Sequence, residues 1–239
     1  MGTNVRPGIV TNNLLIYLDA GSRMSYVSGS TTWTNLGVPR TAGINGTLAG
    51  TPTFSTANQG SFRLNGTTQY VDLGNNTTTQ VTGSFSIGFV GYMSDTASAT
   101  TTTQTLYGKQ EAGGYGADTN GTPNGVVCYA YIAGGYLTLT DPISNYKNNQ
   151  YFYHVMTYDS TISTLRMYRN GQLVASGVKA GSITNVAVPA LIGANPGLSG
   201  TFNFPLSGSV AVYQHYGRTL SDQEVQQNYS VFKNRFGLP

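Results

Sequence analysis

The stretch YRNGQLVASG, residues 168–177, carries the strongest local signal of fold in this 239-residue chain. Asn170 and Gly171 stand between two strand-like runs, and an Asn-Gly pair in that position favours a tight type I′ hairpin. Such a hairpin joins neighbouring antiparallel strands. The sequence therefore predicts an antiparallel sheet at this point.

Strand-like runs recur at short intervals on both sides of the hairpin. The run YFYHVMTYD (151–159) is apolar on both alternating faces, which is typical of a central strand covered on both sides. Ten or more short antiparallel strands predict an all-β fold, a two-sheet jelly-roll sandwich that forms one domain over residues 1–239. The Gly-rich stretch 108–125 is predicted to be one long loop. The remaining predicted strands are 14–19, 61–64, 69–73, 84–93, 126–132, 136–140, 164–170, 172–177 and 207–216.

The last segment, RTLSDQEVQQNYSVFKNRFGL (218–238), has a different character and predicts an amphipathic helix over about 221–236. Ser221 and Glu224 have the spacing of a capping box, and Gly237 is a natural left-handed stop. We expect the helix to cover an outer sheet face or an open end of the sandwich, because it presents an apolar stripe made of Val225, Tyr229, Phe232 and Phe236.

Composition excludes several classes of protein. Charged residues make up only 9% of the chain, and the 12 basic residues are dispersed, so we expect no nucleic-acid partner. No apolar run approaches the length of a membrane span, and we expect no membrane insertion. A single cysteine, Cys128, excludes an internal disulfide. With no apolar leader at the N-terminus, we expect synthesis in a cytoplasm.

The sequence also argues against catalysis. Glycoside hydrolysis needs two carboxyl groups on either side of one bond, and the chain has only two glutamates. Glu224 is engaged in the predicted helix cap, and Glu111 lies in the Gly-rich stretch without a nearby carboxylate. We interpret His154 and His215 as half-buried sheet residues and Cys128 as a small core residue. We therefore expect no enzyme activity and no cofactor.

Several segments, taken in order, resemble a known family. The segments are LLIYLDAGSRMSY (14–26), FRLNGTTQYVDLG (62–74), SFSIGFVGYM (84–93), LRMYRNGQLVASG (165–177) and the ending from VAVYQHYG (210–217) to the terminal helix. Together they resemble concanavalin A-like lectin/glucanase domains of the laminin-G-like type, over residues 9–238. The pair YLDAG and LSDQEVQQNY is most similar to versions carried by virion proteins of tailed phages.

Members of that family often carry acidic residues where this chain has Asn35, Asn65, Thr68 and Gln69. Calcium prefers several hard oxygen ligands that include carboxylates, so these replacements weaken any inherited calcium site. The remaining carboxylates, Asp19, Asp72 and Asp118, stand alone in the sequence. We expect no metal site.

One group of residues is a candidate for carbohydrate binding. Tyr115 is flanked by two glycines, and Asp118 and Asn120 follow closely in the same predicted loop. An exposed aromatic ring beside polar groups suits stacking on a sugar and hydrogen bonding to its hydroxyls. An ordinary loop without a ligand is the alternative interpretation.

The resemblance implies a non-enzymatic virion structural protein at the particle surface, either a capsid decoration or a small head or tail appendage. The expected partners are other virion proteins, of the capsid or the tail, and copies of the same chain, because so few charges are unusual for a free monomer. Host-surface glycans remain a further candidate partner. The alternatives are a receptor-binding lectin domain of a tail fibre and a cellular carbohydrate-binding module.

Overall fold

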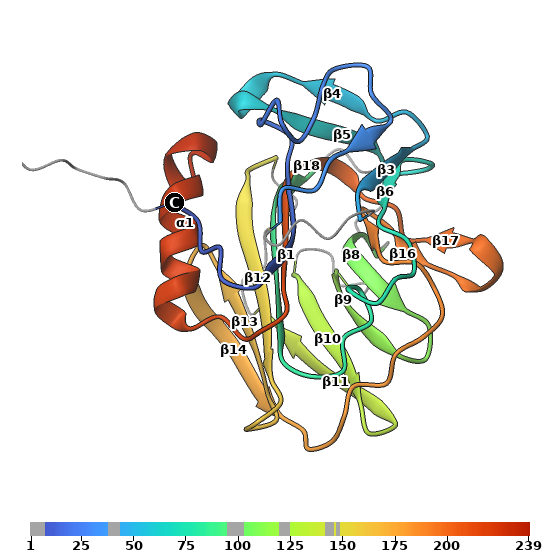
Figure 1. The fold of residues 1–239 in the computed structure, drawn as a ribbon, viewed down its shortest axis with the longest axis vertical. Coiled ribbons are helices and arrows are strands. Elements are labelled where there is room, and N and C mark those ends of the chain that lie inside the picture. Colours follow the sequence, from blue (N-terminus) through green and yellow to red (C-terminus); the bar gives the residue numbers. More distant parts are fainter. Residues whose placement is uncertain (1–7, 38–43, 95–102, 120–124, 142–145, 147–148) are drawn as a thin grey trace, which may run out of the picture.

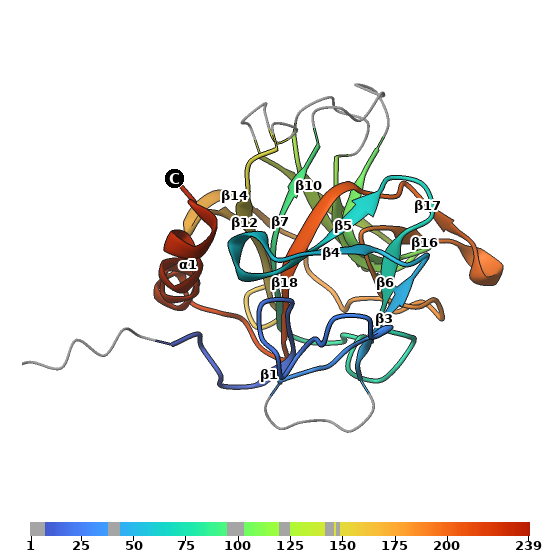
Figure 2. The ribbon, with the colours of Figure 1, turned by 90° about the horizontal axis from the view of Figure 1, so that it is seen from above.

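The computed structural model describes residues 8–37, 44–94, 103–119, 125–141, 146 and 149–239. Two antiparallel sheets face each other as a sandwich, and one helix lies against the outside of the first sheet (Figure 1). Viewed from above, the helix, the first sheet and the second sheet form three successive layers (Figure 2). The predicted all-β sandwich with a C-terminal helix is confirmed.

The first sheet, sheet A, has the strand order β14-β13-β12-β7-β18-β5-β4, and β1 pairs with β18. The second, sheet B, has the order β11-β10-β9-β8-β15-β6-β3-β2. The strands of sheet A are β1 (Leu14–Asp19), β4 (Thr53–Ser55), β5 (Ser61–Asn65), β7 (Phe85–Met93), β12 (Phe152–Asp159), β13 (Thr164–Arg169), β14 (Gln172–Val178) and β18 (Ser207–Tyr216). Those of sheet B are β2 (Thr32–Trp33), β3 (Gly46–Ala49), β6 (Tyr70–Asp72), β8 (Thr105–Gln110), β9 (Gly114–Asp118), β10 (Val127–Ile132), β11 (Gly135–Thr140) and β15 (Leu191–Ile192).

Four short elements of the described chain lie outside these sheets. The 3-10 helix η1 (Ala57–Gln59) connects β4 to β5, beside the C-terminal half of the helix α1 (Asp222–Phe236). A hairpin of β16 (Asn195–Pro196) and β17 (Phe202–Asn203) encloses a second 3-10 helix, η2 (Leu198–Gly200), and projects from the sandwich (Figure 1).

The main core fills the space between the two sheets. Phe85, Ile87 and Phe89 on β7 are fully buried there, together with Cys128 and Ala130 from β10 of sheet B. Alternation of side chains along each strand explains why every second residue belongs to this core. Strand β12 is buried along its length except at its last residue, which confirms the prediction of a central strand covered on both sides.

The Asn170-Gly171 turn has the backbone that its sequence predicts. The φ angles are +48° at Asn170 and +81° at Gly171, and a type I′ turn requires positive values at both central residues. Strands β13 and β14 pair on either side of the turn. The predicted hairpin is therefore confirmed.

The predicted loop over residues 108–125 is wrong in its first part. Strands β8 and β9 form a hairpin there, within sheet B. Two of its glycines, Gly108 and Gly116, allow side chains to lie close to the sheet. A Cβ at Gly116 would lie 2.6 Å from the hydroxyl oxygen of Tyr129, and one at Gly108 would lie 2.8 Å from Oδ1 of Asn195.

Helix α1 confirms the predicted terminal helix and its caps. Ser221 and Glu224 exchange the two hydrogen bonds of a capping box, and Gly237 ends the helix in the left-handed conformation. The backbone N–H of Leu238 then donates to the carbonyl of Lys233 at 3.0 Å, as in a Schellman ending. The helix packs on the outer face of sheet A through a second apolar cluster that includes Val225, Tyr229, Phe232 and Phe236. Among the described residues, no helix is long and apolar enough to cross a membrane.

Candidate functional site

The outer face of sheet A has two parts of different chemistry. The part beneath α1, which we call the covered region, is mainly apolar and includes Val90, Tyr153 and Val212 from three neighbouring strands. Burial raises the pKa of the Tyr153 phenol well above its ordinary value. Beyond the C-terminal end of α1 the same strands continue without a helix above them, and their outward side chains become polar.

Three of these polar side chains lie in one row across the sheet. Tyr92 on β7 is opposite Ser209 on β18, and Ser209 is opposite Arg63 on β5. Residues paired in this way point to the same face, with their Cβ atoms about 5 Å apart. Because a serine stands between two long side chains, the row forms a depression at its centre.

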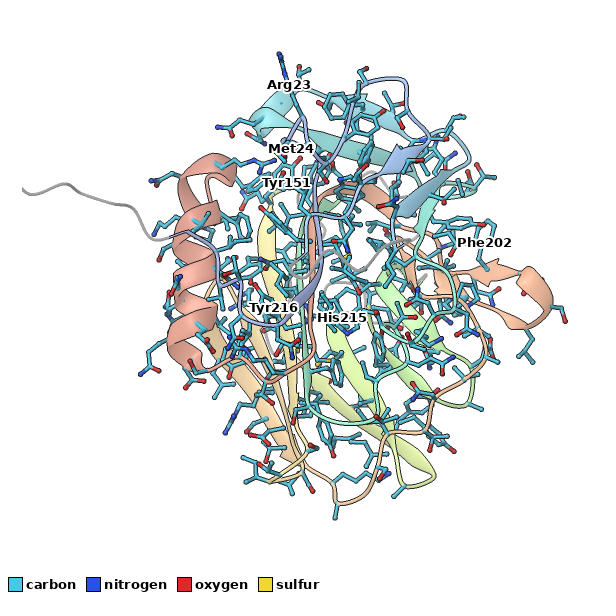
Figure 3. The ribbon with its side chains drawn as sticks, viewed as in Figure 1. Arg23, Met24, Tyr151, Phe202, His215 and Tyr216 are labelled. Carbon is cyan, nitrogen blue, oxygen red and sulfur yellow. The ribbon has the colours of Figure 1, made fainter. Side chains whose placement is uncertain are left out.

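Tyr151 fixes one wall of the depression. Its ring packs edge-on against Tyr92, with the ring centres 5.1 Å apart, and also lies 5.0 Å from the ring of Phe236 at the end of α1. Its hydroxyl donates to Oγ of Ser61 at 3.1 Å and lies 3.4 Å from Oγ of Ser209. Figure 3 shows Tyr151 between α1 and the β4–β5 pair. Contacts on both sides make this ring a rigid part of the site.

The depression is a pocket of about 500 Å³, which is within the usual range for small-molecule sites. Its lining offers hydroxyls, amides, two aromatic rings and one guanidinium group. Among the described residues that line it there is no carboxylate. The lining residues are Ser55, Ala57, Asn58, Ser61, Arg63, Tyr92, Ser94, Asn149, Tyr151 and Ser209.

Arg63 is the ionic group of this pocket. Its side chain is exposed, and Nη2 donates to the Tyr92 hydroxyl at 3.5 Å. Three other arginines in the described part of the chain form ion pairs, whereas Arg63 has no carboxylate partner there. The ion pairs are Arg169–Asp141, Arg218–Glu224 and Arg235–Asp19.

The structure places two of the predicted carbohydrate-binding residues, Tyr115 and Asp118, on sheet B. Tyr115 is only 1% exposed, so the expectation of an exposed loop aromatic is wrong. It lies on β9, packs 5.2 Å from the ring of Phe85, and donates from its hydroxyl to the carbonyl of Thr79 at 3.1 Å. The flanking glycines belong to the strand and not to a loop, which explains the error.

Asp118 and Asn120 do not complete a site with Tyr115. Asp118 is 6% exposed and accepts a hydrogen bond from the Tyr129 hydroxyl at 2.8 Å. Because it is three residues along the same strand, it points to the opposite face of sheet B from Tyr115. Asn120 lies outside the described residues. Tyr115 and Asp118 therefore do not form one binding site.

The two histidines and the single cysteine are buried in the interior of the sandwich. His154 and His215 are fully buried, deeper than the half-buried positions that the sequence predicts, and burial lowers their pKa values to about 3 and about 4. Cys128 lies in the core as predicted, and burial raises the pKa of its thiol. No group of three or more potential metal ligands occurs among the described residues.

The pocket residues were not recognised from the sequence. Within the strand-like run SFRL (61–64), the alternation of apolar and polar residues indicates that Arg63 points outward. Nothing in the sequence, however, gives the pairing of β5 with β18 and of β18 with β7. The pocket depends on that pairing.

Comparison with solved structures finds the same fold in the binding domains of several toxins. The binding domain of Paraclostridial Mosquitocidal Protein 1 has a TM-score of 0.73 and 14% identity, over 95% of this chain and 55% of that one. The receptor binding domain of botulinum neurotoxin type G has a TM-score of 0.64 and 18% identity, over 92% and 51%. The serotype D ligand binding domain, solved in complex with N-acetylneuraminic acid, has a TM-score of 0.69 and 12% identity, over 93% and 52%.

The chain thus spans about half the length of these solved domains, and at such identities the likeness concerns the fold. A comparison with curated protein sequences finds no match. A family profile described as the concanavalin A-like lectin/glucanases superfamily matches residues 65–226, from the end of β5 into α1. The chain belongs to this superfamily.

Proposed function

We propose that this chain is a non-enzymatic binding domain that holds a glycan in the pocket beyond the end of α1. The observation that carries the proposal is the pocket's lining, which combines the rings of Tyr92 and Tyr151 with serine hydroxyls and side-chain amides. Sugars present apolar ring faces and many hydroxyls, and sites that bind them need both kinds of group. The solved toxin domains with this fold are binding domains, which supports the same class of function.

The chemistry of the pocket favours binding over hydrolysis. Both common mechanisms of glycoside hydrolysis use a pair of carboxyl groups, and the described lining of the pocket has none. Glu224 is held by Arg218 at 2.6 Å, which lowers the pKa of its carboxyl to about 2. Such a group stays ionised and is unsuited to act as a general acid near neutral pH.

Binding measurements on a glycan array, followed by calorimetry, test the proposal. We expect wild-type protein to bind a defined set of oligosaccharides, and Tyr92→Ala to lose most of that affinity because it removes the exposed part of the aromatic wall. Tyr136→Ala is the matched control, since Tyr136 is a partly exposed tyrosine on β11 of sheet B. Binding that survives Tyr92→Ala but not Tyr136→Ala would place the site on the other sheet.

We propose the surface of a tailed-phage virion as the place where this domain acts. The sequence resemblance to phage virion proteins supports this, and so does the small number of charges, 21 in 239 residues, which suits a subunit docked on other proteins. Capsid decoration, a head or tail appendage and a tail-fibre lectin domain all agree with a glycan-binding pocket. A cellular carbohydrate-binding module is the alternative.

Mass spectrometry of purified virions tests this location directly, and light scattering over a range of concentrations tests self-association. We expect the chain in stoichiometric amounts in the particles and an oligomer in solution. A strict monomer that is missing from virions but binds an oligosaccharide would favour the cellular module.

A further inference from the structure

Arg63 is the one arginine among the described residues that line the pocket. It stands in the row formed with Ser209 and Tyr92, at the edge of the pocket. A guanidinium has five N–H donors, and one of them is used here, in the 3.5 Å contact with the Tyr92 hydroxyl. The other donors have no partner among the described residues.

Among the described residues, no carboxylate forms an ion pair with that guanidinium. Asp19, on β1 of the same sheet, is paired with Arg235 at 2.8 Å. Arg235 also donates from Nε to the carbonyl of Asn58, a residue of the pocket lining, at 2.9 Å. Asp19 is thus neutralised by its own partner, and Arg63 is a cation without an ion pair among the described lining residues of the pocket.

We infer that the pocket prefers glycans that carry a carboxylate, such as uronic or sialic acids, and that Arg63 binds this carboxylate. The inference rests on the proposed function and specifies its ligand class. A planar guanidinium and a carboxylate match in shape, and their paired, charge-assisted hydrogen bonds are stronger than bonds between neutral groups.

The neighbours of Arg63 fit the rest of such a sugar. Ser209 lies directly beside Arg63 in the sheet, and because it is fully buried it forms the floor of the pocket. Tyr92 lies on the far side of Ser209 and provides a half-buried ring, and the partly exposed Ser55, which pairs with Ser61 of β5, provides a hydroxyl. One sugar can therefore contact the cation, a hydroxyl and an aromatic ring together.

Calorimetry with matched pairs of ligands tests the inference. The probes are trigalacturonic acid and 3′-sialyllactose, each compared with its methyl ester, which keeps the sugar and removes the charge. We expect at least one acid to bind about 10- to 100-fold more tightly than its ester, the range expected for a charge-assisted hydrogen-bonded pair. The preference should weaken as salt rises, because Arg63 is exposed.

Substitutions then test whether Arg63 causes the preference for acids over their esters. Arg63→Gln should abolish the difference between acid and ester, and Arg63→Lys should keep part of it, because a lysine retains the charge without the planar fork. Arg23→Gln is the matched control, since it removes the same charge from another exposed arginine outside the pocket (Figure 3). Circular dichroism should show unchanged folding for all three variants.

Three results would contradict the inference. Equal binding of acids and esters, or array binding of neutral or sulfated glycans alone, would overturn the carboxylate preference and leave the proposed function standing. A preference for acids that survives Arg63→Gln would overturn the role of Arg63. No binding of any glycan would overturn both the inference and the proposed function.

Discussion

The covered region and the pocket are built on the same strands of sheet A, and their chemistry is opposite. On β7, Val90 lies under the helix and Tyr92, two residues further, lines the pocket. On β12, Tyr153 lies under the helix, and Tyr151, which directly precedes the strand, lines the pocket. On β18, a bulge between Val210 and Val212 separates the covered Val212 from Ser209 in the pocket.

The chemistry of the outer face changes at the point where the helix ends. Phe236 is the last apolar residue of α1, and Gly237 ends the helix directly after it. Strand residues that face the helix are buried by it and are apolar or, like Gln214, hydrogen-bonded to buried partners, whereas those beyond its end meet water and can be polar. The end of α1 therefore sets both the boundary of the second apolar cluster and the position of the pocket.

Deletion of residues 221–239 removes the helix and should have the largest effect on stability. It exposes the whole covered region and removes five buried side chains, which together contribute roughly 8–15 kcal/mol of burial energy. These are Val225, Tyr229, Phe232, Phe236 and Leu238. That loss is comparable to the whole stability of a typical domain, so we expect an insoluble or unfolded product. A soluble truncated protein with the wild-type melting temperature would show that the helix is dispensable.

Acid should destabilise the same strands from their inner face. His154 on β12 and His215 on β18 are fully buried, and burial lowers their pKa values to about 3 and about 4. Below pH 6.5 the unfolded chain binds protons at both residues and the folded protein does not, so the free energy of unfolding falls as the pH falls. At pH 5 we expect a loss of about 2 kcal/mol for each histidine.

Urea titrations at pH 7.5 and pH 5 measure this loss. The variant His215→Leu serves as the control, because neither ring nitrogen of His215 has a hydrogen-bond partner among the described residues. It should remove about half of the pH dependence. The same slope in wild type and variant would show that other groups cause the acid sensitivity.

Arg235→Gln should lower the free energy of unfolding by loosening the last turn of α1, where the covered region meets the pocket. Its guanidinium is largely buried, pairs with Asp19 at 2.8 Å and donates to the carbonyl of Asn58, so it ties the last turn of α1 to β1 and η1. Hydrogen bonds to charged groups contribute about 1.5–3 kcal/mol, and we expect a loss of that size in chemical denaturation. An unchanged midpoint would mean that the pair adds nothing to stability in solution.

Ser221→Ala acts at the other end of the helix, far from the pocket. The serine hydroxyl accepts a hydrogen bond from the backbone N–H of Glu224, and the loss of such a cap costs about 1 kcal/mol. We expect a small drop in melting temperature and no change in glycan affinity. Ser221→Asp, which can also cap, should restore the stability.

Most of the fold could be predicted from local sequence, because its signals are local. The turn at Asn170 and Gly171, the strand 207–216 and the caps of α1 each depend on a few neighbouring residues with distinct preferences. The exception is the β8–β9 hairpin. Its glycines resemble those of a loop, and only the side chains packed across them, Tyr129 and Asn195, reveal their purpose.

The candidate site could not be predicted for the opposite reason. Tyr92, Ser209 and Arg63 are far apart in the sequence and are joined only by the register of three strands. Alternation predicts that each points away from the core, but not that they meet. Tyr115 had a stronger local signal, because its flanking glycines suggested a loop, and that signal was misleading.

Arg63→Gln should have the smallest effect on stability and the clearest effect on the pocket. Arg63 is exposed, has no ion pair among the described residues and makes one long contact with Tyr92, so its removal should change the free energy of unfolding by less than about 0.5 kcal/mol. Arg235→Gln removes the same group from the boundary and should cost several times more. If Arg63→Gln destabilised the protein as much as Arg235→Gln, Arg63 would have a structural partner, and its charge would no longer be free for a ligand.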